Sequence, residues 1–354
     1  MKIAFLHLTM GLNNRGSEIS TDIIASELSK GHKVLVVQGG LASKKTYQIK
    51  RPVRVRNSHK SAPQNIFEKI IFRLYLDKQS NLIKKFTEKS LKNLKQFNPD
   101  IIIPVNGKPQ IQIIKRNFPN KKIAIFGRAG MGYHDRDSLG QGPNLFIALS
   151  KNSKTWAKKL KPKNTKISYI PNPVDISHFA KTNKAKTEIK SPTVLVVGAL
   201  TKYKNIDLVI KAVAKTNFSL MILGAGEEKD YIQKLAKKLL PKRHVITTSA
   251  YEDLPSYYKS SDLFCFMPDA QEAFGRVYIE AMAAGLPIVA SSDKIRKSII
   301  GKNGIFVDHN PKQIAKAIEK NINKKPINYH KELEKFDKKN ISDQIEKQLK
   351  KLLN

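Results

Sequence analysis

The chain has 354 residues, enough for two domains that each bury a hydrophobic core. Its formal net charge of +36 is compatible with nucleic acid, an anionic membrane surface or an acidic substrate as a partner. The single cysteine, Cys265, excludes a disulfide within the chain, as expected in a reducing cytoplasm, and no apolar run is long enough to cross a bilayer.

The positive charge comes mainly from lysine and is spread along the whole chain. Proteins that read nucleic acids tend to use arginine for bidentate contacts with bases and phosphates. An AT-rich genome also enriches lysine and asparagine on protein surfaces. We therefore interpret the charge as compositional bias combined with attraction to a membrane, and we expect no nucleic-acid partner.

Apolar, strand-like runs alternate with helix-like segments from end to end, which predicts parallel sheets covered by helices. The apolar start, residues 1–8, is too short for a signal peptide and is interpreted as containing the first strand. The predicted strands are residues 3–8, 34–37, 101–105, 123–126 and 145–149 in the first half, and 193–197, 219–223, 244–247, 263–267 and 288–290 in the second. Each half would build its own doubly wound, Rossmann-like sheet.

A basic amphipathic stretch covers residues 66–97, where aromatic and aliphatic side chains are mixed with many lysines. Such segments can lie on anionic lipid. They can equally be ordinary helices that cover a core and turn a lysine face to solvent. The sequence leaves both interpretations open.

Two short patterns suggest other chemistry and are set aside. Asp135 and Asp137 form an Asp-x-Asp pattern of the kind that holds a divalent metal, but they follow a glycine-rich loop, and we expect no metal site. Gly224 and Gly226 begin a dinucleotide fingerprint that fails at Lys229, where a third glycine is required.

The most informative segment contains two glutamates, Glu272 and Glu280, eight positions apart with Gly275 between them. A helix is predicted to begin near this glycine and to end at Gly285, with Pro287 just beyond. Helix N-terminal amides bind phosphates, and carboxylates accept hydrogen bonds from vicinal hydroxyls. An amphipathic helix with two exposed acids is the alternative, but the spacing and the Gly-x-Pro exit favour a site for a sugar nucleotide.

These residues resemble the signature of the retaining GT-B glycosyltransferases of family 4, in which a Glu-x-Phe-Gly segment and a second glutamate precede Ala-Met-Ala-x-Gly-x-Pro. The resemblance implies that Glu272 contacts the transferred sugar and that Glu280 holds the nucleotide ribose. It also implies that the amides of Phe274 and Gly275 line the donor.

Three further segments resemble the same family. Arg15-Gly16-Ser17-Glu18 corresponds to its Gly-Gly-x-Glu loop, in which Arg15 replaces the first glycine and only the second glycine, Gly16, is retained. The segment from residue 170 to residue 179 resembles Pro-Asn-Gly-Val-Asp-x-x-x-Phe, which closes the last strand of the first domain. The loop from Gly198 to Lys204 resembles the segment whose arginine and lysine neutralise the donor diphosphate.

Two charged groups of the family pattern are missing. Ala199 occupies the position of the arginine in the phosphate clamp, and Arg276 is our candidate for its replacement. The family histidine that follows the strand at residues 123–126 is also absent, and Arg128 or His134 are candidates to take its role.

The resemblance therefore predicts an α/β protein of the GT-B fold, with two doubly wound parallel-sheet domains facing across a cleft. The expected acceptor-side domain is residues 1–180, and the expected nucleotide-sugar domain is residues 181–327, a range that begins with a lysine-rich linker at 181–192. A charged helical segment, residues 328–354, would cross back to the first domain. The implied catalytic residues are Glu272, Lys204, Arg128 and His134, and the implied donor-binding residues are Gly16, Gly198, Lys204, Gly224, Glu272, Ala273, Phe274, Gly275, Arg276 and Glu280.

The expected function is transfer of a sugar from a nucleoside-diphosphate sugar to a glycan or lipid-linked acceptor with retention of configuration, as in bacterial cell-surface polysaccharide synthesis. No cofactor or metal is expected, and the protein would be cytoplasmic or peripheral on the inner face of the plasma membrane. The alternative is a catalytically degenerate relative that acts as a basic sugar-nucleotide or membrane-surface binding protein. Ala199 and the absent histidine favour this alternative slightly.

Overall fold

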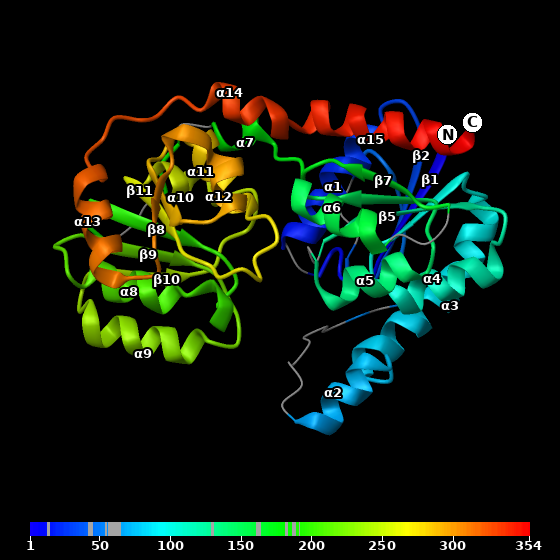
Figure 1. Ribbon diagram of the computed structural model, residues 1–354, viewed down its shortest axis with the longest axis horizontal. Coiled ribbons are helices and arrows are strands. Elements are labelled where there is room, and N and C mark those ends of the chain that lie inside the picture. Colours follow the sequence, from blue (N-terminus) through cyan, green and yellow to red (C-terminus); the bar gives the residue numbers. More distant parts are fainter. Residues whose placement is uncertain are drawn as a thin grey trace. The chain divides into compact units, whose positions relative to one another are not determined.

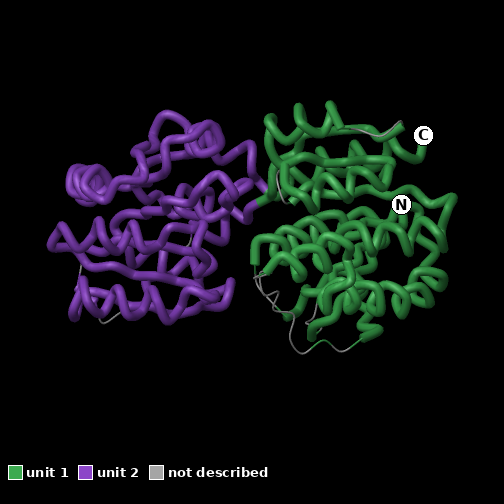
Figure 2. Tube along the Cα trace, turned by 60° about the horizontal axis from the view of Figure 1, so that its bottom comes forward, with its two compact units in different colours: residues 1–173, 338–354 green, residues 174–337 purple. Residues whose placement is uncertain are grey.

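The computed structural model spans residues 1–354 and describes all of them except 13–14, 42–44, 54, 56–64, 129–130, 161–163, 181–182, 186–188 and 191. Much of the predicted linker at 181–192, and two residues of the glycine-rich loop before His134, therefore lie outside the described residues. The chain divides into two compact units, residues 1–173 with 338–354 and residues 174–337 (Figure 2).

The first unit is a seven-stranded parallel sheet in the order β3-β2-β1-β4-β5-β6-β7. Its strands are β1 (Lys2–His7), β2 (Lys33–Gln38), β3 (Gln48–Lys50), β4 (Ile101–Pro104), β5 (Lys122–Gly127), β6 (Leu145–Ala148) and β7 (Lys166–Tyr169). Its helices are α1 (Gly16–Leu28), α2 (Ile66–Arg73), α3 (Lys78–Phe97), α4 (Lys108–Asn117), α5 (Tyr133–Gly140), α6 (Lys151–Leu160) and α15 (Lys338–Leu353).

Alternating side chains of β1 enter two hydrophobic cores on opposite faces of this sheet. Ile3 and Phe5 pack on one face with residues of α1 and α15. Ala4 and Leu6 pack on the other face with residues of α3, α4, α5 and α6. Because β strands present successive side chains to opposite faces, a strand that is apolar at every position is buried between two layers of helices.

The second unit is a six-stranded parallel sheet in the order β10-β9-β8-β11-β12-β13. Its strands are β8 (Thr193–Val197), β9 (Ser219–Leu223), β10 (His244–Thr247), β11 (Leu263–Phe266), β12 (Ile288–Ser291) and β13 (Ile305–Val307). Its helices are α7 (Ile176–Phe179), η1 (Lys202–Lys204), α8 (Ile206–Val213), α9 (Lys229–Leu239), α10 (Leu254–Lys259), α11 (Arg276–Ala283), α12 (Lys294–Ile300), η2 (Gly301–Asn303), α13 (Pro311–Asn321), α14 (His330–Leu333) and η3 (Glu334–Phe336) (Figure 1).

The predicted fold class, two doubly wound parallel sheets, is confirmed, and every predicted strand is present within one or two residues of its expected bounds. Two strands, β3 and β13, were not predicted. Each has three residues at an edge of its sheet, and no side chain of either is fully buried. A short, partly exposed edge strand has too few apolar residues to give a hydrophobic pattern from which it could be predicted.

The boundaries between the units lie at residues 173/174 and 337/338 and not at 180/181 and 327/328 as predicted. The first difference arises because Phe179 packs edge-on against the rings of Tyr251 and Tyr258, with centroids 5.7 and 5.5 Å apart. The second arises because the Tyr329 hydroxyl donates to the Leu286 carbonyl and the Phe336 ring contacts the ring of Phe274. Both segments therefore belong to the second unit.

Helix α15 closes the core of the first unit, although it follows the second unit in the chain. Ile341, Ile345 and Leu349 are each at most 1% exposed and join the core that contains Ile3. The side chain of His32 also pairs with Glu346 of this helix at 3.0 Å. Among the helices of the described residues, none combines the length and the apolar character needed to span a membrane.

Candidate active site

The loop between β11 and α11 carries Glu272, and its end is shaped by a glycine. Gly275 is the N-cap residue of α11 and has a φ of 85°. A Cβ atom at this position would lie 2.8 Å from the ring of Tyr278, so a larger residue would meet both strain and a clash. The hydroxyl of Tyr278 donates to the Phe266 carbonyl at 2.7 Å, which joins the two ends of the loop.

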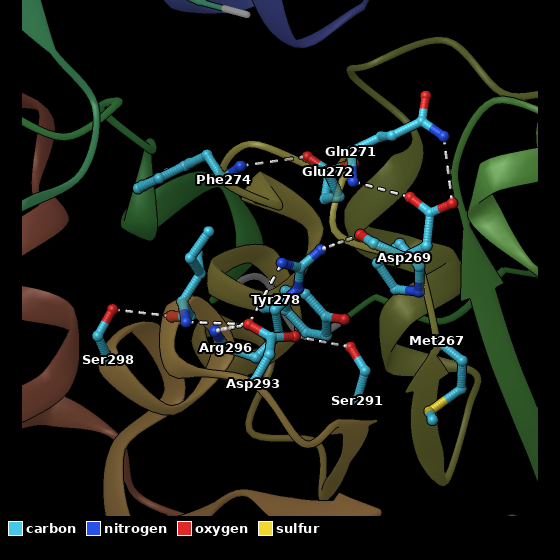
Figure 3. Close-up of polar contacts among 12 residues, drawn as sticks. Met267, Asp269, Gln271, Glu272, Phe274, Tyr278, Ser291, Asp293, Arg296 and Ser298 are labelled. Carbon is cyan, nitrogen blue, oxygen red and sulfur yellow. Dashed lines mark hydrogen bonds and ion pairs between the residues drawn. The ribbon is translucent and has the colours of Figure 1, made fainter. Parts of the chain in front are cut away.

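Side chains from outside the loop form hydrogen bonds with the backbone of its first residues. The Nη2 of Arg296, on α12, donates to the carbonyl of Asp269 at 3.2 Å (Figure 3). His309 contacts the carbonyl of Met267 at 3.0 Å, and Asn205 donates to the same carbonyl at 3.1 Å. Backbone carbonyls that would otherwise bond to water are thus held by fixed donors, and the loop has a defined path.

Glu272 pairs with Lys204, 68 residues away in the sequence. Its Oε2 accepts from the Lys204 ammonium, and its Oε1 accepts from the amide of Phe274 at 3.3 Å. The ammonium also lies 4.8 Å from the ring centroid of Tyr203 and 5.4 Å from that of Phe266. The two charged side chains are only 12% and 14% exposed, so their charges are poorly screened by water.

Glu280 lies in a second, more deeply buried polar cluster. Its Oε2 accepts from the hydroxyl of Tyr258 at 3.0 Å, and its Oε1 is 3.6 Å from the Nη2 of Arg276. Burial raises the pKa of the Glu280 carboxyl, and the Arg276 guanidinium opposes that shift. The two glutamates of the motif therefore have different partners, although they lie on one loop and the helix that follows it.

Arg276 is 6% exposed, and its guanidinium contacts Glu280. The sequence suggested that it replaces the arginine missing at Ala199. In the structure its charge is matched by a carboxylate within the same helix, whereas Lys204 is the cation that lies beside Glu272. Whether Arg276 reaches a donor phosphate stays a prediction.

The predicted glycines of the second unit serve close packing at the carboxyl ends of the strands. A Cβ atom at Gly224 would lie 1.9 Å from the carbonyl oxygen of Gly198, and one at Gly226 would lie 2.2 Å from that of Leu200. The Gly-x-Gly pattern thus lets the loops after β8 and β9 touch. This explains the pattern without a dinucleotide.

In the first unit, the predicted residue Arg128 bonds to the first turns of α1, the helix that begins at the predicted residue Gly16. Gly16 is the first residue of the helix, and Arg128 follows β5 directly. The Arg128 guanidinium donates to the Ser17 carbonyl at 2.9 Å and to the Thr21 hydroxyl at 3.1 Å. Arg128 therefore joins the carboxyl edge of the sheet to α1.

The same place holds His7, which the sequence analysis did not single out. His7 ends β1, is 1% exposed, and contacts the hydroxyl of Ser17 at 2.9 Å. Burial lowers its pKa to about 4, with Glu18 opposing and Arg128 reinforcing the shift. A polar residue at the end of an apolar run was the available signal, because ligand sites of parallel sheets lie at the carboxyl ends of strands.

His134 is placed in a group of aromatic rings on the first unit. Its ring centroid is 5.5 Å from that of Phe72, 6.5 Å from that of Tyr75 and 5.6 Å from that of Tyr133. The Tyr75 hydroxyl donates to Asp137, the second acid of the Asp-x-Asp pattern, at 3.0 Å. The structure thus gives His134 and Asp137 packing partners, and the catalytic role predicted for His134 stays a prediction.

Comparison with solved structures identifies the fold. HepE of Anabaena in complex with UDP-glucose aligns with a TM-score of 0.74 at 18% identity, over 99% of this chain and 100% of that chain. Sucrose-phosphate synthase of Thermosynechococcus elongatus aligns with a TM-score of 0.75 at 17% identity, over 99% of this chain and 98% of that chain. Both units together have the GT-B fold of glycosyltransferases.

Sequence comparison finds a family that matches part of the chain. Residues 179–342 match the model of the family "Glycosyl transferases group 1". An uncharacterized glycosyltransferase of Haemophilus influenzae is 35% identical over 187 residues, which are 50% of this chain and 51% of that protein. A GDP-mannose-dependent phosphatidylinositol monomannoside mannosyltransferase of Mycolicibacterium smegmatis is 27% identical over 40% of this chain and 43% of its own length. The chain thus spans about half, or less, of these curated relatives.

Proposed function

We propose that the protein transfers a sugar from a nucleoside-diphosphate sugar to a glycan or lipid-linked acceptor, with retention of configuration at the anomeric carbon. The observation that carries this proposal is the pairing of Lys204 with Glu272 beside the start of α11, inside the domain that matches the family. The process served would be the assembly of bacterial cell-surface polysaccharide or glycolipid at the inner face of the plasma membrane.

Lys204 and Glu272 have complementary chemistry for such a donor. A diphosphate would draw the Lys204 ammonium, and the hydroxyls of the sugar would donate to Glu272, which only accepts hydrogen bonds. Departure of the diphosphate places negative charge next to Lys204, and a poorly solvated cation stabilises that charge most effectively. Lys204 would thus lower the barrier, while Glu272 would align the sugar.

Glu280 is proposed to hold the nucleotide ribose. Its carboxylate accepts from Tyr258 and faces Arg276, and a carboxylate has lone pairs for further hydroxyl donors. Glu272 and Glu280 have separate partners, and we therefore do not propose them as the pair of carboxylates that hydrolases place on either side of a glycosidic bond. This arrangement favours transfer over hydrolysis.

Several related proteins support a nucleotide-sugar donor. HepE was crystallised with UDP and with UDP-glucose, and the mycobacterial relative is named as dependent on GDP-mannose and as acting on a phosphatidylinositol mannoside. A lipopolysaccharide core glycosyltransferase of Rhizobium meliloti, 30% identical over 43% of this chain, supports a glycolipid acceptor.

The first test is release of nucleoside diphosphate from a panel of UDP- and GDP-sugars. With the active donor, we expect Glu272→Gln to lower kcat about a hundredfold, because one hydrogen-bonded group that orients the reacting sugar is altered. A Glu272→Gln variant that turns over like the wild type would remove Glu272 from the mechanism. Turnover in the presence of a chelator should be unchanged, because Lys204 and the helix amides offset the phosphate charge in this scheme without a metal.

A matched set of variants tests the phosphate clamp. Lys204→Ala should weaken donor binding about tenfold or more, because a charge-assisted contact to phosphate is lost. Lys202→Ala is the control, since Lys202 lies in the same short helix and is exposed. Arg276→Ala decides whether Arg276 replaces the missing arginine: donor affinity equal to that of the wild type would exclude it.

The alternative function is that of a catalytically degenerate binding protein, which Ala199 favours because one cation of the clamp is missing. The same assay separates the two proposals. A binding protein would bind nucleoside diphosphate in a calorimetric titration but release none from any sugar nucleotide.

A further inference from the structure

Helix α2 presents an apolar face that no described residue buries. Ile66 is 77% exposed, Phe67 69% and Ile70 51%, and Leu74, directly after the helix, is 61% exposed. None of the eight residues of the helix is buried. Figure 1 shows α2 as an arm that extends away from the sheet of its unit. Single exposed apolar residues are ordinary, whereas a continuous exposed face marks a contact surface.

The orientation of the helix is set by its opposite side. The ring of Phe72 contacts Tyr133 and His134, with centroids 6.3 and 5.5 Å away, and the Tyr133 hydroxyl donates to the carbonyl of Arg73. At about 100° per residue, the exposed face from Ile66 to Leu74 points away from Phe72. The helix is therefore anchored through Phe72 with its apolar stripe turned toward solvent.

Two cations border this apolar stripe. Lys69 and Arg73 project from the side of the helix next to Ile66 and Ile70. These residues, with Phe72 and Tyr133, line a surface hollow of about 380 Å³. A hollow lined by apolar and aromatic side chains together with two cations matches an amphiphile that has a hydrocarbon body and an anionic head.

We propose that this surface, α2 with Leu74 and the adjoining hollow, docks the first unit on an anionic lipid bilayer. Ile66, Phe67, Ile70 and Leu74 would enter the boundary between headgroups and acyl chains, and Lys69 and Arg73 would bind lipid phosphates. This inference deepens the proposed function, because it names the surface that would bring the enzyme to a lipid-linked acceptor.

A lipid bilayer fits better than a second copy of the chain. Each copy carries a net charge of +36, so two copies repel one another, whereas an anionic bilayer attracts each copy. A soluble glycan acceptor would use polar groups and would leave the four apolar side chains in water. The charge complementarity therefore selects the bilayer.

The experiment is cosedimentation of the whole protein with vesicles of phosphatidylglycerol and phosphatidylcholine, and with vesicles of phosphatidylcholine alone. We expect binding to the anionic vesicles and much weaker binding to the neutral ones. The variant Ile66→Ser/Ile70→Ser/Leu74→Ser and the variant Lys69→Glu/Arg73→Glu should each lower the partition coefficient about tenfold or more. Added salt should weaken binding of the wild type.

Matched controls lie elsewhere on the surface. Lys237→Glu/Lys238→Glu reverses two exposed lysines of α9, and Tyr231→Ser/Leu353→Ser removes two side chains that are 46% and 41% exposed. Both should bind vesicles like the wild type. Circular dichroism and nucleotide release with a soluble acceptor show whether the α2 variants are folded, and they report the proposed activity separately from lipid binding.

Equal partition of the α2 variants and the wild type, or no preference of the wild type for anionic vesicles, would overturn the proposal. A second copy of the chain would be the occupant instead if the wild type did not bind vesicles, formed a dimer detected by light scattering, and lost that dimer in the Ile66→Ser/Ile70→Ser/Leu74→Ser variant. That result would also overturn the proposal. Failure of sugar transfer together with intact vesicle binding would instead count against the proposed function alone.

Discussion

Arg296 is 1% exposed, one of the largest fully buried side chains of the described residues. Burying a guanidinium is costly unless its donors are used. Here they reach the Asp269 carbonyl and, at 3.4 Å, the carboxylate of Asp293 (Figure 3). Asp269 begins the turn that presents Glu272, since the Glu272 amide donates to the Asp269 carbonyl at 3.2 Å. Arg296 is thus a positioning residue that acts through the loop.

Replacing Arg296 tests this role. Arg296→Met should lower stability by about 2 kcal/mol, because hydrogen bonds from a charged group are lost, and should lower kcat more than it weakens donor binding. Arg296→Lys should be little better than Arg296→Met in stability and kcat, since a single ammonium cannot reproduce the planar, forked donors of a guanidinium. Lys294→Met, on the exposed side of the same helix, is the control. An unchanged kcat in a folded Arg296→Met protein would limit Arg296 to a structural role.

His7 makes the stability of the first unit depend on pH. Its pKa is about 4 in the folded protein against 6.5 as the ordinary value, so only the unfolded chain binds a proton between these limits. Stability should therefore fall as the pH is lowered from 6.5 toward 4, and this contribution should be constant below 4. From pH 6.5 to pH 5 the loss attributable to His7 is about 2 kcal/mol.

The measurement is denaturant unfolding followed by the fluorescence of Trp156, the only tryptophan of the chain, which packs in the first unit. His7→Gln should show a smaller loss of stability between pH 6.5 and pH 5. His330→Gln, at an exposed position of the second unit, should behave like the wild type. If His7→Gln keeps the full pH dependence, His7 is not its source.

At the level of elements, helix ends follow local rules. The predicted exit of α11 at Gly285 is confirmed: this residue has a φ of 79°, its amide bonds to the Met282 carbonyl, and the Leu286 amide bonds to the Ala281 carbonyl. These two bonds form a Schellman motif, which favours glycine at the left-handed position. Such features depend on neighbours within a few residues, and for this reason the sequence could predict them.

Helix α15 depends instead on distant partners. Leu349 is fully buried in the core of the first unit, and Leu349→Ala should destabilise that unit by about 3 kcal/mol through the lost apolar contacts and the cavity left behind. Leu353→Ala, at a side chain that is 41% exposed, should change stability by less than about 0.5 kcal/mol. Unfolding monitored by Trp156 compares the two, and equal stabilities would mean that α15 contributes little to this core.

At the level of the whole molecule, two sheets of the same plan are built from different halves of the chain, and only the second half matches the family model, at residues 179–342. The sequence motifs that carried the functional interpretation lie mostly in this half. The first half was recognised mainly by its strand pattern, with weaker support from the family-like segment at residues 15–18, and its polar residue His7 carried no signal specific enough to select it. This difference explains why the predicted site residues of the second unit are better defined than those of the first unit.

The sequence by itself determined the alternation of strands and helices and the two-sheet architecture. It also determined the start of α11 near Gly275, its end at Gly285, and the segment that carries Glu272. Tertiary structure alone decided that Lys204 pairs with Glu272, that Arg276 faces Glu280, that Arg296 holds the loop, and that the apolar face of α2 points outward. Periodicity and capping are short-range effects, because they depend on residues within one or two helical turns of each other. Side-chain partners separated by tens of residues are chosen by how the elements pack, and packing depends on the shapes and charges of all of them together.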